Sequence, residues 1–599
     1  MMKRTHMCGE LRAENIGQNV VLAGWVNTYR EQGKSLKFID LRDRAGLTQI
    51  VFHLEDAGQD VIDAARKLRR EDVIAVMGLV QRREGGPNPK LDTGEIEVHA
   101  SRLQVLNETD VPPILPDEYE AQKIAEDKRL QYRYIDLRRP RMQQILRIRN
   151  RVTRVARDFF DDHGFIEIET PFLIKTTPEG ARDFIVPSRM YPGHWYALPQ
   201  SPQIFKQILM VAGCDRYMQI VRCFRDEDPR ADRQAEFSQI DLEMSFVDRD
   251  DVMTTMTAFV KRLWRQLLDV ELGDIPVMTY THAMNRYGID RPDLRFGLEI
   301  EDVSDLAGKS DFRVFADALA KPDGVVKALR VPGAAAQMSR KITDAYNEFV
   351  KTFKAGGLAS VKCTDAGFET GIAKFLQPVA EPLTQRLHLN PGDIVFFTAD
   401  TADIALKAIG ELRIRIARDL QLIDTNAWKM LWIVDFPMFE FDQDARRWVA
   451  LHHPFTSPLP DQFDILDTDP ARCVSAAYDL VCNGSEIAGG SIRIHRPEIQ
   501  QKVFKLLGIG EEEAEQKFGF LLRALRFGAP PHGGIAFGLD RLVMLLAGTD
   551  NIRDVIAFPK TQTGQDLMTE APGPVDPRQL EELCVRVNLP EEALSGDVS

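Results

Sequence analysis

The segment RDEDPRADRQAEFSQID, residues 225–241, decides the fold of this chain. An arginine and two acids follow Phe224, a charged loop comes next, and an alternating run begins at Phe237 and continues to Glu243. This pattern predicts a strand, a long turn and an antiparallel return strand. An arginine fixed beside such a turn suits a ligand with several phosphates, because a guanidinium is planar, permanently charged and able to bind oxyanions through two hydrogen bonds.

A second arginine-bearing segment, GGIAFGLDR, occupies residues 533–541 and continues into an apolar run from Leu542 to Leu546. It predicts a strand that leads into a helix through glycine. Two separated segments that each keep an arginine beside acidic residues therefore indicate a shared polyphosphate site.

Composition limits the class of protein. The chain has 599 residues, 44% hydrophobic and 28% charged, so we expect a globular protein of two to four domains. No apolar stretch approaches the roughly 20 residues that span a bilayer, and the N-terminus MMKRTHMCGEL lacks the apolar core of a signal peptide. We therefore expect no membrane segment and a cytoplasmic location. The seven cysteines show no CxxC pairing, which favours idle or buried thiols.

The charge distribution is uneven. The net charge of −14 argues against a protein that coats nucleic acid indiscriminately. Residues 128–157, however, hold eleven Lys and Arg and a single acid, Asp136. This run is either a helix face balanced by acidic neighbours in space or a contact surface for an RNA backbone.

Residues 1–108 predict a small barrel. Five strands are expected at 20–26, 37–40, 48–52, 73–80 and 95–106, with one helix at 57–70 between the third and fourth. This order matches the OB-fold, a Greek-key barrel that binds oligonucleotides.

The rest of the chain predicts a multidomain α/β (α+β) protein. The proline-rich DVPPILP, residues 110–116, begins a linker. After the barrel we expect these segments: a hinge at 109–145, the first part of a split α/β core at 146–294, an inserted α/β module at 295–420, the second part of the core at 421–558 and a C-terminal extension at 559–599.

Five segments together resemble the class II aminoacyl-tRNA synthetases, and most closely their bacterial aspartyl family. The segments are TPEGARDF (177–184), ALPQSPQIFKQ (197–207), CFRDED (223–228), HHPFTSP (452–458) and FGLDR (537–541). The resemblance extends over nearly the whole chain. It implies an OB-fold anticodon domain, an antiparallel-sheet catalytic core with an inserted module, and a homodimer built around the strand that ends at Pro171.

The resemblance implies that ATP and L-aspartate form aspartyl-adenylate, and that aspartate then passes to the 3′ end of tRNA(Asp). No general base is required, because the attacking carboxylate is already ionised, so positioning and charge stabilisation supply the catalysis. Arg225 would bridge the α-phosphate and the substrate carboxylate, Arg541 would hold the γ-phosphate, and Phe237 would stack on adenine. The full set implied for ATP is Arg225, Asp226, Glu227, Gln234, Phe237, Glu486, Gly538, Leu539, Asp540 and Arg541.

Asp479 and Glu486 would hold Mg²⁺, which prefers oxygen ligands shared with substrate phosphates. The Asn483-Gly484 pair between them predicts a hairpin that brings both acids to one region. Without the flanking motifs, two acids on an exposed hairpin would be the simpler interpretation. Ala488 departs from a more glycine-rich form of this loop.

Aspartate would need two cations around its side chain, and Lys206 and Arg493 are the candidates. Asparagine would leave such a buried pair undercompensated, at about 3–5 kcal/mol. The full set implied for aspartate is Glu179, Gln203, Lys206, Arg225, Asp241, His452 and Arg493. His452 and His453, if extended, point to opposite faces and cannot bind one ion.

For tRNA, the matching anticodon contacts are Arg30, Phe38, Gln49 and Glu97. Phe38 is equally compatible with the barrel core, whereas Gln49 should face outward. Members of the family restricted to tRNA(Asp) carry Leu and Lys at the positions of Gln32 and Gly85, and relaxed members carry His and Gly. Gln32 matches neither form, whereas Gly85 matches the relaxed form and favours an enzyme that also charges tRNA(Asn), with an amidotransferase partner.

Two alternatives remain at the level of sequence. An asparaginyl-type relative would lose either the Lys206 and Arg493 charges or the barrel. A non-catalytic RNA-binding relative would lose the arginines or the metal acids. This chain keeps all of them.

Overall fold

A computed structural model gives the positions of residues 2–33, 35–177, 181–227 and 232–589. The chain forms two compact units. The first comprises residues 1–150, 229–234 and 547–575, and the second comprises residues 151–228, 235–546 and 576–599.

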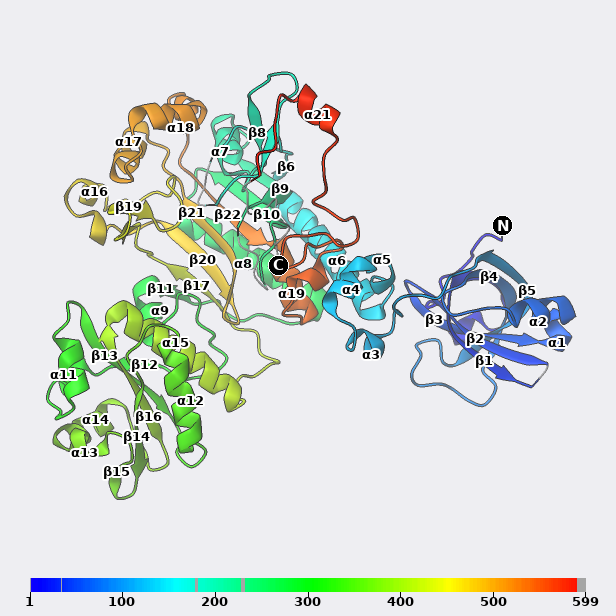
Figure 1. The fold of residues 1–599 in the computed structure, drawn as a ribbon, viewed down its shortest axis with the longest axis horizontal. Coiled ribbons are helices and arrows are strands. Elements are labelled where there is room, and N and C mark those ends of the chain that lie inside the picture. The colour runs from blue at the N-terminus through cyan, green and yellow to red at the C-terminus, as the bar shows by residue number, and fades with distance from the viewer. Residues whose placement is uncertain (1, 34, 178–180, 228–231, 590–599) are drawn as a thin grey trace. The chain divides into compact units, whose positions relative to one another are not determined.

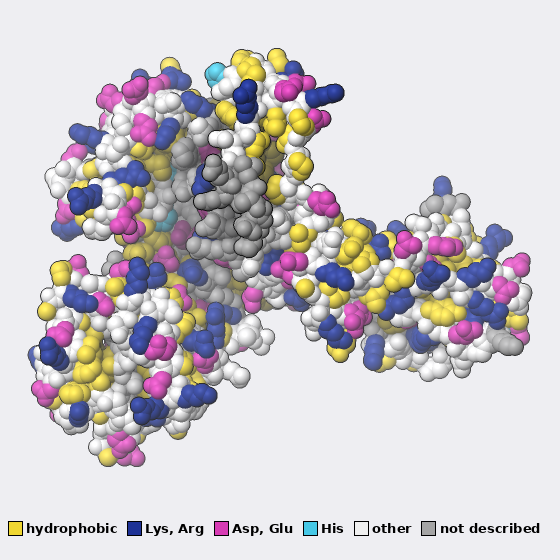
Figure 2. Space-filling model, viewed as in Figure 1, with side chains coloured by type: hydrophobic (Ala, Val, Ile, Leu, Met, Phe, Trp, Pro, Cys, Tyr) yellow, Lys and Arg dark blue, Asp and Glu magenta, His cyan; other side chains and the backbone are white. Residues whose placement is uncertain are grey.

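The first unit begins with a closed barrel whose strands pair in the order β1-β2-β3-β5-β4 (Figure 1). Its strands are β1 (Asn19–Gln32), β2 (Leu36–Asp43), β3 (Gly46–His53), β4 (Val73–Arg82) and β5 (Ile96–Asn107). The predicted OB-fold is confirmed. The predicted helix is two short helices, α1 (Leu54–Ala57) and α2 (Gln59–Ala65), because Gly58 between them has a φ of 80°. Figure 2 shows acidic and basic side chains interspersed over the face of the barrel in view.

Short helices form the rest of the first unit. They are α3 (Glu118–Ala121), α4 (Glu126–Gln131), α5 (Arg133–Asp136) and α20 (Ile552–Val555), together with the part of the longer α6 (Pro140–Asp162) that precedes residue 151. The buried Arg133 holds them together, since its guanidinium donates to the carbonyls of Arg553, Ile556 and Ala557 at 2.7, 2.9 and 3.0 Å.

An eight-stranded, mostly antiparallel sheet forms the centre of the second unit, in the order β11-β17-β20-β21-β22-β10-β9-β6. The strands are β6 (Ile166–Glu167), β9 (Arg216–Phe224), β10 (Glu236–Ser245), β11 (Val277–Thr279), β17 (Met430–Val434), β20 (Ala477–Cys482), β21 (Ser485–Ile492) and β22 (His532–Gly538). β9 and β10 are the predicted strand and antiparallel return strand. β22 leads directly into α19 (Leu539–Ala547), as predicted for residues 533–546.

The two faces of this sheet differ. Phe537 on β22 packs against Phe259 of α8 (Arg249–Leu268), and Phe259 packs against Phe160 near the end of α6. These helices bury the apolar face. The opposite face carries the polar side chains described below and is approached by α7 (Gln203–Val211). The remaining helices of the unit outside its second large sheet are α9 (Tyr280–Tyr287), α16 (Ile465–Thr468), α17 (Pro497–Leu506), α18 (Glu511–Leu525) and α21 (Pro577–Glu582).

Between β11 and β17 the chain builds a second sheet, in the order β12-β13-β16-β14-β15 (Figure 1). Its strands are β12 (Ile300–Asp302), β13 (Gly324–Val331), β14 (Ala359–Thr364), β15 (Gly367–Glu369) and β16 (Ile394–Thr401). Its helices are α10 (Ser304–Ala307), α11 (Arg313–Leu319), α12 (Arg340–Lys351), α13 (Ala373–Leu376), α14 (Ala380–Arg386) and α15 (Ala402–Asp419). α12 and α15 cover one face, while α10, α11, α13 and α14 cover the other. We call residues 300–419 the inserted module.

Two small hairpins complete the fold, β7 (Ile185–Pro187) with β8 (Trp195–Ala197) and β18 (Phe439–Asp442) with β19 (Arg447–Ala450). None of the helices in the described part of the chain combines the length and apolar composition that crossing a bilayer requires.

Candidate active site

Alternate residues of β10 carry the polar face of the eight-stranded sheet. Phe237, Gln239, Asp241 and Glu243 are spaced two apart, so their side chains leave the strand on the same side. The neighbouring strand β22 has a glycine opposite Glu243. Gly534 pairs with Glu243, and a Cβ on Gly534 would lie 1.9 Å from Glu243 Oε2. Glycine at this position therefore makes room for the buried carboxylate.

Four charged groups meet on this face, all buried. Lys206 Nζ lies 3.0 Å from Asp241 Oδ2 and 3.3 Å from Glu243 Oε2. Arg493 donates from Nε to Glu243 Oε1 at 3.1 Å and from Nη1 to Ser491 Oγ at 2.8 Å. The structure thus brings together the two cations that the sequence assigns to aspartate recognition.

Glu243 corrects the predicted charge balance. The sequence predicts that Lys206 and Arg493 form a cation pair whose charge only a substrate carboxylate compensates. In the structure Glu243 contacts both cations and Asp241 contacts Lys206, so the four charges already sum to zero. The cost of about 3–5 kcal/mol for asparagine assumed an uncompensated pair, and this assumption is wrong. Strand alternation could have identified Glu243, because it lies two residues after Asp241.

The two acids have different ionisation tendencies. Burial raises the pKa of Asp241 to about 6, although Lys206 opposes the shift. For Glu243, burial acts in the same direction, but the charges of Arg493 and Lys206 outweigh it and hold the pKa below its ordinary value. Glu243 is therefore the permanent counter-ion of the cluster.

Two buried polar atoms beside this cluster have no hydrogen-bond partner among the described residues. They are Gln203 Nε2, a donor, and Asp241 Oδ1, an acceptor. Burying such atoms unpaired is costly, which indicates that a ligand supplies the partners. A molecule with both a carboxylate and an ammonium group would satisfy both atoms. Glu179, which belongs to the set implied for aspartate, lies outside the described residues.

A β-bulge places the second group of site residues. Glu486 and Arg493 are seven residues apart, and in a regular strand such an odd spacing points side chains to opposite faces. The pairing of β21 with β20 skips Ile487, which is the extra residue of a bulge. Glu486 and Arg493 therefore both lie on the face that carries Asp479.

Gly489 stands opposite Asp479 because of this bulge. A Cβ on Gly489 would lie 2.8 Å from Asp479 Oδ1 and 3.4 Å from Glu486 Oε1, so the two carboxylates converge on one small space. In an unbulged hairpin Ala488 would occupy that place. The departure of Ala488 from a glycine-rich loop is harmless, since its buried side chain lies on the other face.

The convergent carboxylates fit Mg²⁺. The burial of Asp479 and the charges of Glu486 and Asp290 raise its pKa well above the ordinary value, as expected where acids gather without a cation. No cluster of three or more His, Cys, Asp or Glu in metal geometry occurs in the described ranges. A site with two protein carboxylates matches the way Mg²⁺ shares its coordination with substrate phosphates.

His452 lies in a bend and His453 in the irregular segment that follows, rather than in an extended strand, which corrects the argument from strand alternation. The His452 ring meets Phe436 edge to face at 4.6 Å, and its Nε2 is 4.0 Å from Asp479 Oδ2. Burial and the neighbouring His453 lower the pKa of His452 to about 4, so it is neutral at pH 7. His453 instead packs on Phe455.

Two arginines border the carboxylates and the aromatic ring assigned to adenine. The Arg225 guanidinium lies 5.1 Å from the centroid of the Phe237 ring. Arg541 donates from Nη1 to the carbonyl of Glu486 at 2.6 Å. The two arginine-bearing segments, 225–241 and 533–541, thus meet through the pairing of β10 with β22, while Arg225 precedes β10 and Arg541 lies in α19.

Some residues assigned to ATP make structural contacts. Asp540 is buried, and its Oδ2 accepts a hydrogen bond from the Ser238 amide at 2.7 Å, which fixes the start of α19 to β10. Gly538 pairs with Gln239 at the end of β22, and Leu539 is buried at the start of α19.

The loop between β9 and β10 is anchored at both ends. The Asp226 amide donates to the carbonyl of Arg182 at 3.0 Å, and the Glu227 amide donates to that of Arg225 at 3.1 Å. In the first unit, the Gln234 side chain accepts from the Lys560 amide at 2.8 Å and donates to its carbonyl at 3.0 Å. The Gln234 amide is therefore engaged with the backbone, a role the sequence did not predict.

In the barrel, the residues assigned to the anticodon form one network on the outer face. Gln49 Oε1 accepts from Arg30 at 3.0 Å and from Arg83 at 2.8 Å, while its Nε2 donates to Glu97 at 2.7 Å. Gln49 faces outward as predicted, but it is buried beneath these side chains. Phe38 is half-buried with Arg30 5.8 Å from its ring centroid, so it lies on the outer face rather than in the core.

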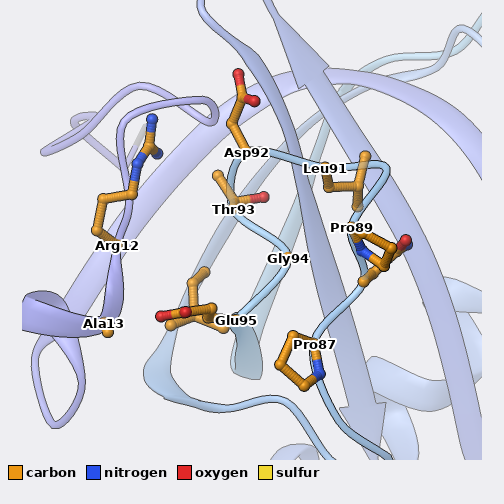
Figure 3. A pocket seen from close by; sticks show the side chains of 11 residues that line it. Arg12, Ala13, Pro87, Pro89, Leu91, Asp92, Thr93, Gly94 and Glu95 are labelled. Carbon is orange, nitrogen blue, oxygen red and sulfur yellow. The ribbon is translucent and has the colours of Figure 1, made fainter.

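The two positions linked to tRNA choice are exposed. Gln32 ends β1, and Gly85 lies in the β4–β5 loop with a φ of 86°. The same loop, with Arg12, lines a hollow of about 410 Å³ whose walls include Pro87, Leu91 and Glu95 (Figure 3).

The basic run at residues 128–157 is mostly structural. Arg133 and Arg139 are buried and both bind Asp136. Other members bind backbone carbonyls or acids: Arg138, Arg141, Arg149, Arg151 and Arg157. The structure therefore favours the interpretation of a charge-balanced helix.

Comparison with known proteins agrees with this geometry. The sequence profile described as tRNA synthetases class II (D, K and N) matches residues 125–562, and that described as OB-fold nucleic acid binding domain matches residues 20–106. A relative from Caldanaerobacter subterraneus subsp. tengcongensis, named aspartate–tRNA(Asp/Asn) ligase, is 50% identical over 98% of this chain and 99% of its own. A relative from Clostridium perfringens, named aspartate–tRNA ligase, is 49% identical over 99% and 98%.

Solved structures share the fold. Asparaginyl-tRNA synthetase from Pyrococcus horikoshii, complexed with asparaginyl-adenylate, superposes with a TM-score of 0.58 at 19% identity, covering 94% of this chain and 99% of that one. Aspartyl tRNA synthetase from Entamoeba histolytica gives a TM-score of 0.56 at 19% identity, covering 93% and 91%.

Proposed function

The chain belongs to the class II tRNA synthetases of the D, K and N type, and from this membership we propose that it activates L-aspartate with ATP and transfers it to tRNA. The observation that carries the proposal is the pocket around Lys206, Arg493 and Asp241. It combines two cations with an unpaired donor on Gln203 and an unpaired acceptor on Asp241, which suits a small amino acid with an acidic side chain.

In the first step a carboxylate oxygen of aspartate attacks the α-phosphorus of ATP. The bond from that phosphorus to the bridging oxygen breaks, and pyrophosphate leaves with the electron pair. Arg225 is assigned to the α-phosphate and the substrate carboxylate, and Arg541 to the γ-phosphate. Phe237 offers a flat ring to adenine. These groups position reactants and stabilise charge, so no side chain needs to remove a proton in this step.

Mg²⁺, held by Asp479 and Glu486, would neutralise the phosphate charge. Gly489 leaves room beside both carboxylates. Neutral His452 meets Phe436 edge to face and lies beside Asp479, and without a positive charge it does not repel the cation.

In the second step a ribose hydroxyl at the 3′ end of tRNA attacks the aspartyl carbonyl carbon. The bond from that carbon to the phosphate oxygen breaks, AMP leaves with the electron pair, and the hydroxyl proton passes to the AMP phosphate or to water. We assign Arg30, Phe38, Gln49 and Glu97 to the anticodon. Their outward network on an OB-fold supports this assignment, because such barrels bind single-stranded nucleic acid by stacking and by contacts to base edges.

We propose a relaxed enzyme that charges tRNA(Asp) and tRNA(Asn) in the cytoplasm, with an amidotransferase that converts the product on tRNA(Asn). Gly85 supports this breadth. Relatives at about 50% identity are named aspartate–tRNA(Asp/Asn) ligase in one case and aspartate–tRNA ligase in another, so the tRNA set must be measured. We also propose that the domain division follows the predicted segments, with the barrel reading the anticodon and both catalytic parts forming one sheet.

A homodimer is part of the proposal. The strand assigned to the interface and its surroundings expose large apolar side chains, including Ile166, Phe172, Leu173, Ile185 and Trp195. Exposed apolar surface of this kind is typical of a subunit interface. Sedimentation equilibrium would give the mass of the particle.

The deciding experiment is charging of purified tRNA(Asp) and tRNA(Asn) with labelled aspartate and ATP. Charging of both supports the relaxed enzyme, and charging of tRNA(Asp) alone rejects it. Failure with both, together with no aspartate-dependent exchange of pyrophosphate into ATP, would reject the catalytic assignment.

A further inference from the structure

The turn of the β20–β21 hairpin is held by the two segments that join the inserted module to the eight-stranded sheet. The entry linker, residues 288–299, runs from α9 to β12, and the exit linker, residues 420–429, runs from α15 to β17. The hairpin carries Asp479 on one strand and Glu486 on the other.

The exit linker binds Asn483 through three hydrogen bonds. The Asn483 amide donates to the Lys429 carbonyl at 2.9 Å, and its Oδ1 accepts from the Lys429 amide at 2.8 Å. Its Nδ2 donates to the Ala427 carbonyl at 3.0 Å. Trp428 between them packs on Trp264 of α8, with ring centroids 5.4 Å apart. The exit linker is thus packed against α8 and holds the turn through these hydrogen bonds.

The entry linker contacts the other residue of the turn. Arg291 donates from Nη1 to the Gly484 carbonyl at 3.1 Å. A Cβ on Gly484 would lie 3.1 Å from Asp293 Cβ, so the linker packs directly against the turn. Both residues of the turn have positive φ, 52° for Asn483 and 82° for Gly484, as a tight hairpin requires.

Arg413 ties the entry linker to the module. This buried residue of α15 donates to the carbonyls of Asp293 at 2.9 Å, Phe296 at 3.1 Å and Leu298. Its guanidinium also lies 4.1 Å from the Phe296 ring centroid. The last helix of the module and the segment beside the turn therefore form one connected piece.

The hairpin depends on such support because of its bulge. The regular ladder between β20 and β21 is interrupted at Ile487, between the middle of the sheet and the turn. Glu486 lies on the turn side of that interruption. Its backbone is therefore held on this side of the bulge by its pairing with Val481, by the hydrogen bond from Arg541 to its carbonyl and by the nearby turn.

We propose that the two linkers of the inserted module position the hairpin that carries Asp479 and Glu486, with Asn483 as the positioning residue through which the exit linker acts. The expected effect on the Mg²⁺ requirement rests on the proposed function, whereas the positioning of the hairpin does not. The module would thereby influence the nucleotide site without contributing a side chain to it.

The test is Asn483→Gly, because glycine keeps the positive φ and removes only the side-chain bonds. We expect faster hydrogen exchange of the amides at residues 481–487. We also expect the Mg²⁺ concentration for half-maximal ATP–pyrophosphate exchange to rise about tenfold, the lower end of the effect for partners that orient metal ligands. KM for aspartate should stay unchanged, since its pocket is built on α7, β10 and Arg493.

Gln421→Gly is the matched control. Gln421 lies in the same linker with a positive φ of 54°, and no contact of its side chain with the hairpin is found in the described part of the structure. Arg291→Gln tests the entry linker if Asn483→Gly unfolds the protein. Arg413→Lys should also quicken exchange at 481–487, which a defect confined to the turn would not produce.

Unchanged exchange at 481–487 in both Asn483→Gly and Arg291→Gln would overturn the proposal. So would equal effects of Gln421→Gly. If the parent protein lacks aspartate-dependent pyrophosphate exchange, the proposed function fails, but the hydrogen-exchange result still decides the positioning role.

Discussion

Glu243 lies between the two cations of the amino-acid pocket. Its charge therefore determines the free-energy cost of burying these cations when no substrate is bound. Glu243→Gln keeps the size and removes the counter-ion of buried Lys206 and Arg493. Breaking a buried pair from one side costs about 3–5 kcal/mol. We expect a lower unfolding temperature without substrate and a larger stabilisation by aspartate than in the parent, because the substrate carboxylate supplies the missing charge.

Scanning fluorimetry with and without saturating aspartate measures both effects. Glu236→Gln is the control, since Glu236 begins the same strand and is partly exposed. Equal aspartate-induced shifts in Glu243→Gln and the parent would show that Glu243 does not share its cations with the substrate.

Asp241 should give aspartate binding a pH dependence. Burial raises its pKa to about 6, above the ordinary value, so the carboxylate gains a proton as pH falls through that value. The protonated form loses the charge that attracts the ammonium group of the substrate. We expect KM for aspartate to rise between pH 7 and pH 5, and Asp241→Asn to show a high KM without this rise.

The pH profile of aspartate-dependent pyrophosphate exchange measures this. The same group gives a stability term of opposite sense: because its folded pKa is raised, the folded state is favoured as pH falls from about 6 toward the ordinary value. A variant profile parallel to that of the parent would assign the dependence to another group.

At the scale of elements, alternation and turn chemistry predicted most of the site. The β9–β10 return, the strand before Arg541 and the Asn483-Gly484 hairpin follow from local patterns. The bulge at Ile487 does not, because it exists only in the pairing between two strands. Because the bulge is not visible in the sequence, the sequence could not show that the side chains of Glu486 and Arg493 lie on the same face of the sheet.

Gly489→Ala tests the space that this bulge creates. Its Cβ would lie 2.8 Å from Asp479 Oδ1, a distance that forces the carboxylate to move. We expect the rate of ATP–pyrophosphate exchange to fall by about tenfold or more and the Mg²⁺ requirement to rise, since orientation of ligands sets metal affinity. Measurement at varied Mg²⁺ and fixed ATP separates the two effects.

Ala488→Gly is the control for this change. It alters the adjacent residue of the same strand, whose side chain lies on the other face. Both variants should keep the secondary structure seen by circular dichroism. Equal activity of Gly489→Ala and the parent would mean that the carboxylates do not act at the position that the glycine leaves open.

At the scale of the whole molecule, the sequence predicted the barrel, the central sheet and the interrupted core, because each has its own pattern of strands and helices. It did not predict the partners that distant segments provide. Gln234 binds the backbone of Lys560, and the basic run at 128–157 binds carbonyls and acids, although both had suggested ligand contacts. Such pairings depend on tertiary neighbours that no local pattern records.

The amino-acid pocket lies in one compact unit and the barrel lies in the other. A change in the barrel should therefore alter tRNA choice and leave adenylate formation intact. Gly85→Lys is such a change. No atom lies within 4 Å of a Cβ at Gly85, so the side chain fits, and its positive φ costs about 1–2 kcal/mol.

We expect Gly85→Lys to lower kcat/KM for tRNA(Asn) more than for tRNA(Asp), with pyrophosphate exchange unchanged. Gly86→Lys is the matched control, because Gly86 has a φ of 92° and equally open surroundings. Charging of both tRNAs with labelled aspartate by the parent and both variants measures the ratio. If Gly86→Lys shifts the ratio as far as Gly85→Lys, added charge in the loop rather than this position governs the choice. If the parent charges tRNA(Asp) alone, glycine at position 85 does not confer relaxed recognition.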